Sequence, residues 1–307
     1  MQREPFLIVG TGAMACLFGA HLAPHADLTL LGTWREGLAA LQAGGIRLAV
    51  DGQESSFLVR ATADPGACQG IRHALVLVKS WQTRRAVQQL AQCLAPDGIA
   101  LTLQNGLGNL ELLQEALGSE RAALGVTTYG ATLLAPALVR AGGVGVTHVA
   151  HHPRLPPLIE RLRQAGIRIE LADDLLALLW GKLSVNAGIN PLTALLRVPN
   201  GELLDREHSR ALMAAATEEV AAVAEACGIR LAHTDPAGHV IEVARRTAAN
   251  RSSMLQDVLR GAPTEIDAIC GAVVLEGQRL GVPTPVNWTF WNLIRSVVTP
   301  SAGDDHR

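Results

Sequence analysis

The chain has almost no lysine. Lys79 and Lys182 are the only lysines among its 26 cationic residues, and the rest are arginines. Arginine stays protonated in proteins, whereas lysine can release a proton when its environment lowers its pKa. Each retained lysine therefore marks a position where arginine could be a poor substitute. Chance retention is the alternative, and composition by itself leaves it open.

Other absences exclude whole classes of protein. No run of lysine and arginine suggests nucleic-acid binding, and the formal net charge is only −2. An anionic ligand would therefore need a local positive site. No stretch approaches 18 uninterrupted apolar residues, so we expect no membrane span. The apolar start of the chain resembles a signal peptide, but glycines interrupt it in a pattern with a better explanation.

Metal and disulfide signatures are also missing. The five cysteines form no CxxC pair, and the ten histidines form neither an HExxH motif nor a cluster with zinc spacing. We therefore expect no metal site. The odd number of cysteines favours free thiols in a reducing cytoplasm.

What the sequence does contain is an α/β pattern followed by helices. Short apolar runs alternate with helical segments up to about residue 171, which predicts a doubly wound, mainly parallel sheet. Within it, Asp51-Gly52 predicts a hairpin between strands at 46–50 and 57–60. From residue 173 strand signals almost vanish. We therefore predict an α/β domain over 1–172 and an all-helical domain over 173–307, with helices near 173–189, 206–227, 236–250, 252–260, 264–279 and 287–298.

A glycine motif lies between the first strand and the first helix. Its residues are Gly10, Thr11, Gly12, Ala13 and Met14, followed by Ala15. The first glycine permits the tight turn, and the second lets the backbone approach a pyrophosphate. The third position tolerates alanine because it needs only close helix–strand packing. In this strand–turn–helix context the motif predicts dinucleotide binding at the helix N-terminus.

The end of the second strand indicates which dinucleotide is bound. An NAD site usually has an acidic residue here for the ribose hydroxyls, and the segment Gly32–Arg35 contains none. Thr33 and Arg35 suit a 2′-phosphate instead, so we predict NADPH. A solvated helix position for Arg35 is the alternative.

Four polar segments could bind substrate. Lys182, Asn186 and Asn190 are spaced four apart, which on one helix gives a single polar stripe in an apolar stretch. Pro191 is expected to bend or end that helix. Gln104-Asn105-Gly106 follows a strand, where ligand contacts compete with ordinary turn chemistry. Asn250–Ser253 and Thr264–Asp267 could equally be helix caps, with Thr264 as the cap of the last segment.

Together these motifs resemble the 2-dehydropantoate 2-reductase (ketopantoate reductase) family nearly from end to end. The most specific segments are Lys182–Leu195 and Ser252–Asp257; Val78–Gln82, Gln104–Gly108, Pro199–Glu202 and Thr264–Asp267 also match. The resemblance implies a Rossmann domain, a helical domain, and an active site in the cleft between them. It also implies the reduction of 2-dehydropantoate to pantoate in pantothenate biosynthesis.

The resemblance implies residue roles as well. Lys182 matches the catalytic proton donor, and Glu265 matches the substrate-binding glutamate. The remaining matches are Asn186, Asn190, Asn250 and Ser253 for substrate, and Lys79 and Asn105 near the nicotinamide. Ala15 and Cys270 depart from the family pattern, and Cys270 could alter the pocket.

Three hypotheses about function follow. The first is the family reaction, and the second is NADPH-dependent reduction of another small 2-oxo acid. The third is a non-catalytic dinucleotide-binding regulator, which would need neither Lys182 nor Glu265. The sequence leaves the oligomeric state open, with a homodimer among the possibilities.

Overall fold

The computed structural model describes residues 4–298, which form two compact units. The first unit takes in the chain up to Gln104 together with Asn109–Leu175. The second takes in Asn105–Gly108 and the chain from Leu176 onward. The sequence predicted a single boundary near residue 172. It did not indicate that the short segment 105–108 belongs with the helical unit.

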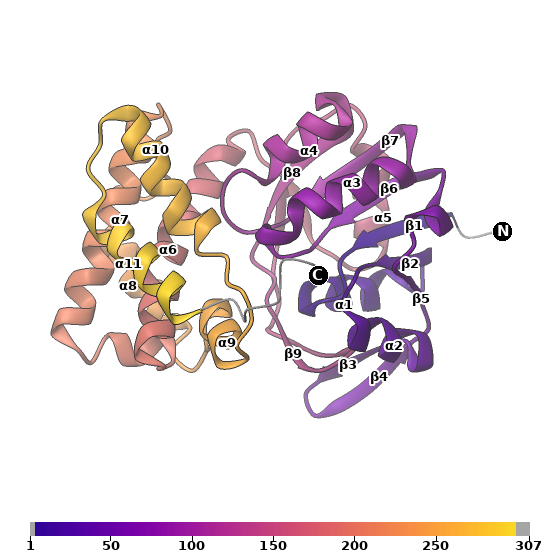
Figure 1. Ribbon diagram of the computed structural model, residues 1–307, viewed down its shortest axis with the longest axis horizontal. Coiled ribbons are helices and arrows are strands. Elements are labelled where there is room, and N and C mark those ends of the chain that lie inside the picture. The colour runs from indigo at the N-terminus through magenta and orange to yellow at the C-terminus, as the bar shows by residue number, and fades with distance from the viewer. Residues whose placement is uncertain (1–3, 299–307) are drawn as a thin grey trace. The chain divides into compact units, whose positions relative to one another are not determined.

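The first unit is built on an eight-stranded sheet in the order β12-β11-β8-β7-β6-β1-β2-β5 (Figure 1). Its strands are β1 (Pro5–Val9), β2 (Asp27–Leu31), β5 (Arg60–Thr62), β6 (Ile71–Val76), β7 (Leu94–Thr102), β8 (Ala122–Thr127), β11 (Thr147–Val149) and β12 (Ile169–Leu171). All neighbouring pairs are parallel except β8 with β11, which confirms the predicted doubly wound α/β class.

Alternate side chains of the central strands bury into two apolar layers. Phe6 and Ile8 of β1 lie with α1 (Ala13–Leu22) and α5 (Pro156–Gln164), whereas Leu7 and Val9 lie with α3 (Thr83–Cys93) and α4 (Asn109–Leu117). The period of two in a strand makes this possible, and burial on both faces explains the continuous apolar runs in the sequence. Helix α4 was not expected from the sequence.

A smaller sheet in the order β4-β3-β10-β9 packs its Ile46 and Val139 into the same layer as α1. Its strands are β3 (Ile46–Val50), β4 (Gln53–Phe57), β9 (Ala131–Ala135) and β10 (Leu138–Ala141). Asp51 and Gly52 form the predicted two-residue hairpin with φ of 49° and 80°. The expected second strand at 57–60 is wrong, because pairing resumes directly at Gln53.

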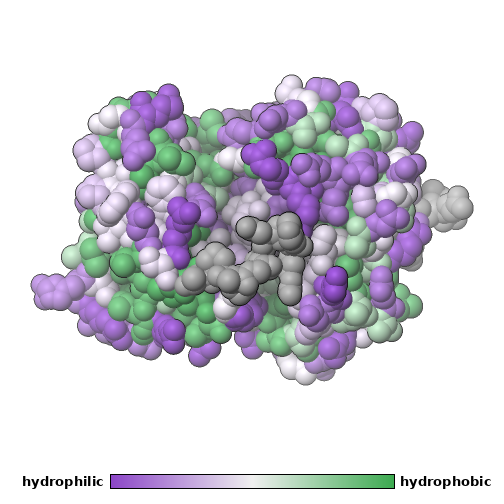
Figure 2. Space-filling view, in the orientation of Figure 1, coloured by the Kyte–Doolittle hydropathy of each residue, from purple (hydrophilic) through white to green (hydrophobic). Residues whose placement is uncertain are grey.

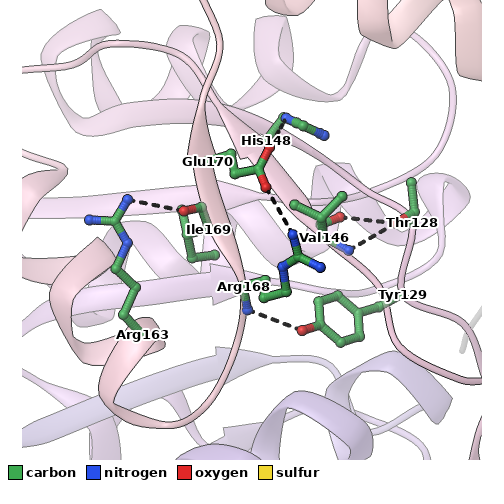
Figure 3. A network of polar contacts seen from close by, with 8 residues as sticks. All are labelled: Thr128, Tyr129, Val146, His148, Arg163, Arg168, Ile169 and Glu170. Carbon is green, nitrogen blue, oxygen red and sulfur yellow. Dashed lines mark hydrogen bonds and ion pairs between the residues drawn. The ribbon is translucent and has the colours of Figure 1, made fainter.

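Polar contacts hold the edge of the main sheet, where β11 and β12 pair (Figure 3). The hydroxyl of Tyr129 accepts the main-chain N–H of Arg168 at 3.1 Å, and Thr128 exchanges two hydrogen bonds with Val146. The Arg168 guanidinium reaches Glu170 at 3.3 Å. These contacts join the segment after β8 to the edge strands.

The second unit is helical, as predicted. Its α-helices are α6 (Leu175–Leu196), α7 (Glu207–Ala226), α8 (Pro236–Arg246), α9 (Ser253–Leu259), α10 (Ala272–Leu280) and α11 (Pro285–Val297). Asp235 caps α8 by accepting the N–H of Gly238, as its position before Pro236 predicted. Figure 2 shows apolar areas among hydrophilic ones on this unit. No helix within residues 4–298 is long and apolar enough to cross a membrane.

Helix α6 does not end at Pro191. Of the predicted bend or end at that point, the helix end is wrong. The helix continues to Leu196 with the proline inside it. Leu192, Thr193 and Ala194 are almost completely buried in the second unit. Their burial offsets the one helical hydrogen bond that a proline cannot donate.

Candidate functional site

The glycine motif in the first unit has the geometry that a dinucleotide requires. Gly10 has φ of 134°, and a Cβ there would meet the Leu77 backbone at 3.0 Å. Gly12 caps the N-terminus of α1, and a Cβ on it would point into open space. The loop therefore offers an uncovered approach to main-chain N–H groups at a helix start, which fits a pyrophosphate.

Thr33 and Arg35 lie next to this loop. The N–H of Gly10 donates to the carbonyl of Leu31 at 2.7 Å, which holds the loop against the end of β2. Thr33 follows β2, and Arg35 begins α2 (Arg35–Gly44); both are exposed. A hydroxyl and a guanidinium are thus presented where the ribose of a dinucleotide would lie, with no acidic side chain in segment 32–35.

Buried polar side chains hold the main chain next to Lys79. Lys79 is half-buried after β6, just before the short turn Ser80–Gln82. The Gln104 amide donates to the Val78 carbonyl at 3.0 Å and to the Thr83 hydroxyl at 2.7 Å. Thr83 in turn donates to Asn109 at 2.8 Å. This network fixes the carboxyl ends of β6 and β7, and the amide at Gln104 was the one residue of it that drew attention in the sequence.

Helix α6 carries the polar stripe of the second unit. Gly188 lies against Thr217 and Met213 of α7, where a Cβ would come within 2.6 Å of the Thr217 hydroxyl. Asn186 and Asn190 lie two positions from Gly188, a rotation of about 200°, and Lys182 lies six positions away, a rotation of about 240°. Lys182, Asn186 and Asn190 therefore lie roughly opposite the face that packs on α7. Their spacing of four places them in one row, as predicted.

The environment of Lys182 is unusual for a lysine. Burial lowers its pKa from the ordinary 10.5 to about 8, and the neighbouring Glu265 carboxylate opposes that shift. Loss of hydration disfavours the ammonium, whereas a nearby negative charge favours it. The residue can thus hold a proton at neutral pH and release it within a physiological range, which arginine cannot do.

Glu265 is buried, with only 4% of its surface exposed, and lies just before a π-helical turn at Asp267–Gly271. The predicted continuous helix from residue 264 is wrong here, because regular α-helix begins only at Ala272. The Thr264 hydroxyl accepts the N–H of Ile266 at 3.4 Å. A π-turn is uncommon in proteins but frequent at functional sites, so the π-turn that follows Glu265 makes this residue a candidate for function.

Asn105 contacts Glu265 although 160 residues separate them in sequence. The Asn105 amide donates to a Glu265 carboxylate oxygen at 3.1 Å. The N–H of Leu107 donates to the Ala268 carbonyl at 2.9 Å, and a Cβ on Gly106 would come within 2.3 Å of that carbonyl oxygen. Segment 105–108 is therefore fitted against the π-turn, and Gly106 permits the close approach.

Thr193 and Ser252 link Asn190 of α6 to the start of α9. The Ser252 hydroxyl caps α9 by accepting the N–H of Leu255 at 3.0 Å, and it lies 2.7 Å from the Thr193 hydroxyl. Thr193 also donates to the Asn190 carbonyl at 3.0 Å. These bonds tie the start of α9 to the polar end of α6. The cap is made by Ser252 and not by the neighbouring Ser253, which is half-buried.

Asn250 and Cys270 have other environments. Asn250 is exposed, and its main-chain carbonyl accepts the N–H of Asn200 at 2.9 Å, which gives the Pro199–Glu202 segment a structural role. Cys270 is fully buried in the core of the second unit, and burial raises the pKa of its thiol. Neither observation places the Asn250 amide or the Cys270 thiol among the contacts around Glu265.

Comparison with known proteins identifies the family. Residues 6–154 match the family described as "Ketopantoate reductase PanE/ApbA", and residues 174–298 match its C-terminal domain. The chain belongs to the ketopantoate reductase family. Members of this family are oxidoreductases built on a dinucleotide-binding fold.

Individual relatives agree with that assignment. A 2-dehydropantoate 2-reductase from Archaeoglobus fulgidus is 37% identical, over 97% of this chain and 99% of its own length. The crystal structure of a PanE/ApbA family ketopantoate reductase from Ralstonia eutropha is 31% identical, covers 96% of this chain and 98% of its own, and superposes with a TM-score of 0.89. D-mandelate dehydrogenase in complex with NADH and anilino(oxo)acetate has a TM-score of 0.90 over 96% and 98% of the two chains. At 23% identity, that likeness shows a shared fold.

Proposed function

We propose that this chain reduces 2-dehydropantoate to pantoate with NADPH, as a step of pantothenate biosynthesis in the cytoplasm. The observation that carries the proposal is the pairing of Lys182, whose pKa is lowered to about 8, with the buried Glu265 in a chain of this family. A non-catalytic regulator would have no use for a lysine poised to release a proton. The relatives named 2-dehydropantoate 2-reductase support the proposed reaction, and the five free thiols fit the proposed cytoplasmic location.

The reaction joins a hydride and a proton to the C2 carbonyl. A nicotinamide dinucleotide, when bound, supplies the hydride. Gly10, Gly12 and the start of α1 would hold its pyrophosphate, and Thr33 and Arg35 its 2′-phosphate. Lys79, after the carboxyl end of β6, is proposed to contact the nicotinamide end. For Asn105, whose amide donates to Glu265, we propose a second role in orienting that carboxylate.

Lys182 is the proposed acid. As the carbon–hydrogen bond forms at C2, the carbonyl π electrons move onto oxygen, and a positioned ammonium stabilises the developing charge. Lys182 then donates its proton to that oxygen, and the amine regains a proton from water. A pKa near 8 keeps the lysine largely protonated at neutral pH while making it a better acid than an ordinary lysine.

Substrate contacts follow from the chemistry of the remaining groups. Asn186 and Asn190 share the stripe with Lys182 and can donate to the substrate carboxylate, as can the Ser253 hydroxyl. Ionised Glu265 is an acceptor and would repel a carboxylate, so we place it at the C4 hydroxyl of dehydropantoate. We retain Asn250 as a polar residue at the margin of the site.

A second candidate function is the reduction of another 2-oxo acid. The fold is compatible with it, because D-mandelate dehydrogenase shares this fold with a TM-score of 0.90 at 23% identity. We would assay the purified protein with 2-dehydropantoate, 2-oxoisovalerate and 2-oxo-2-phenylacetate, following NADPH absorbance. The highest kcat/KM is expected for 2-dehydropantoate. A higher value for either other acid would favour the second function, and tight NADPH binding without any turnover would favour a regulator.

The cofactor preference can be tested at Arg35. Replacing Arg35 with alanine is expected to weaken NADPH binding by about 10-fold or more, because a charge-assisted contact to the 2′-phosphate is lost. NADH, which lacks that phosphate, should bind almost unchanged. Arg47→Ala, which removes an exposed arginine from β3, is the matched control. Equal weakening of both cofactors, or wild-type preference for NADH, would contradict the assignment.

A further inference from the structure

Two cysteines far apart in the sequence meet beneath the surface of the first unit. Cys68 ends the one-turn helix Pro65–Cys68, and Cys93 ends α3. Both thiols belong to the same buried apolar layer and are 3% and 1% exposed. The Cys93 thiol donates to the Pro65 carbonyl at 3.4 Å, so it lies against the turn that carries Cys68.

The two side chains also affect each other's ionisation. A hydrogen bond from Cys93 lowers the pKa of Cys68, and Arg60 adds to the shift while burial and Asp64 oppose it. The same bond raises the pKa of Cys93, with burial acting in the same direction. The pair is therefore asymmetric: Cys68 forms the thiolate more readily, and Cys93 retains the proton.

Local opening of the turn around Cys68 would let a small oxidant reach the pair. Gly66, Ala67, Gln69 and Gly70 around Cys68 are all exposed, although the thiol itself points inward. A single turn of 3₁₀ helix has few hydrogen bonds to break, so local opening of such a turn costs little compared with global unfolding. Cys93, on a regular helix, is covered by that turn.

We propose that Cys68 and Cys93 are a redox-reactive pair that forms an intramolecular disulfide with hydrogen peroxide. The Cys68 thiolate attacks peroxide, so an S–O bond forms, the O–O bond breaks and hydroxide leaves; Cys68 becomes a sulfenic acid. The Cys93 sulfur then attacks Cys68, an S–S bond forms, and the sulfenic oxygen leaves as water with the Cys93 proton. In total two thiols are oxidised, and one peroxide is reduced to two waters.

The bond would close a loop that carries part of the proposed cofactor site. Residues 68–93 include β6, Lys79 and the whole of α3. Since the Cys93 thiol already lies 3.4 Å from the Pro65 carbonyl, in the turn that carries Cys68, closure to the disulfide length of about 2.05 Å requires a local shift of that turn. The disulfide would restrict the unfolded chain and protect Cys68 from irreversible oxidation. The proposal depends on neither the substrate nor the cofactor assigned above.

Peptide mapping of the full-length protein tests the proposal. The reduced protein is treated with hydrogen peroxide, free thiols are alkylated, and the chain is cut with trypsin without reductant. We expect the peptide Ala61–Arg72 joined to Ala86–Arg121, with the link lost on reduction. The oxidised protein should also unfold about 5 °C or more above the reduced one, because the closed loop is 26 residues long. Cys68 recovered as a sulfinic acid beside an alkylated Cys93, or a lower Tm on oxidation, would overturn the proposal.

Single variants test the two roles separately. In Cys93→Ser, Cys68 should accumulate as a sulfenic acid that dimedone traps. In Cys68→Ser, Cys93 should remain a thiol. Cys227→Ser is the matched control, since Cys227 is the least buried of the five cysteines, and it should leave the cross-linked peptide intact. A dimedone adduct on Cys93 but not on Cys68 would reverse the assigned roles and overturn the mechanism.

Discussion

Replacing Lys182 with alanine is expected to lower kcat about 10²–10⁴-fold, the usual contribution of a positioned proton donor. The affinity for NADPH should remain nearly unchanged, because the proposed contacts to its pyrophosphate and 2′-phosphate lie on the first unit and Lys182 lies on α6 of the second. Steady-state kinetics by NADPH absorbance give kcat, and fluorescence titration gives the cofactor Kd. Loss of cofactor binding in parallel with kcat would indicate a structural role for the lysine.

Lys182→Arg is the sharper variant. It keeps the positive charge, but the guanidinium is bulkier and does not release a proton in proteins. We therefore expect Lys182→Arg to remain as impaired as the alanine variant to within about tenfold. Near-normal turnover with arginine would show that charge alone suffices and that Lys182 does not donate the proton.

The pH profile of the wild type belongs to the same prediction. Lys182 acts in its protonated form, and its pKa is lowered from 10.5 to about 8. The kcat should thus be level below about pH 8 and fall about tenfold per pH unit above it. For an unperturbed lysine the fall would begin only near pH 10.5. An alkaline limit at that higher value would contradict the role assigned to burial.

Replacing Glu265 with alanine is expected to cut kcat/KM for 2-dehydropantoate by about 10²-fold or more, which corresponds to about 3 kcal/mol. The proposed reason is that the buried carboxylate accepts the C4 hydroxyl of the substrate. The same variant should lose much less activity with 2-oxoisovalerate, which lacks that hydroxyl. Equal losses on both acids would make Glu265 a structural residue.

Two further variants separate the hydroxyl contact from the charge of Glu265. Glu265→Gln keeps the size of the side chain but removes the charge that raises the pKa of Lys182. Its alkaline limit should therefore move to lower pH than in the wild type. Glu242→Ala removes an exposed glutamate on α8 and should leave both kcat/KM and the pH profile unchanged. An unaltered alkaline limit in Glu265→Gln would mean that the two residues do not interact electrostatically.

Much of the site follows from local sequence patterns. The turn and helix start at Gly10–Met14, the hairpin at Asp51-Gly52 and the cap at Asp235 are each set by neighbouring residues, and all three occur in the structure. The four-residue spacing likewise places Lys182, Asn186 and Asn190 in one row of a helix. In these cases the backbone geometry depends on steric freedom or capping within a few residues, so the sequence suffices.

The sequence failed where burial outweighed a local preference. Pro191 carries a strong signal for a helix end, yet the packing of the following turn keeps α6 intact to Leu196. Thr264 and Asp267 suggest an ordinary helix start, but a π-turn forms beyond Glu265. Both signals describe the preference of an isolated segment, and tertiary contacts changed the outcome.

By itself, the sequence determined the α/β class, the helical second unit, the dinucleotide loop and the identity of the residues that could carry the chemistry. Only the tertiary structure decided which of these residues meet. The amide of Asn105 lies on Glu265, the hydroxyl of Thr193 lies on Ser252, and the thiol of Cys93 lies against the turn that carries Cys68. Side-chain pairs separated by 25 to 160 residues leave no periodic signal, because their contact depends on how whole elements pack. The same packing dehydrates Lys182 and lowers its pKa, a property that its place in the sequence could not reveal.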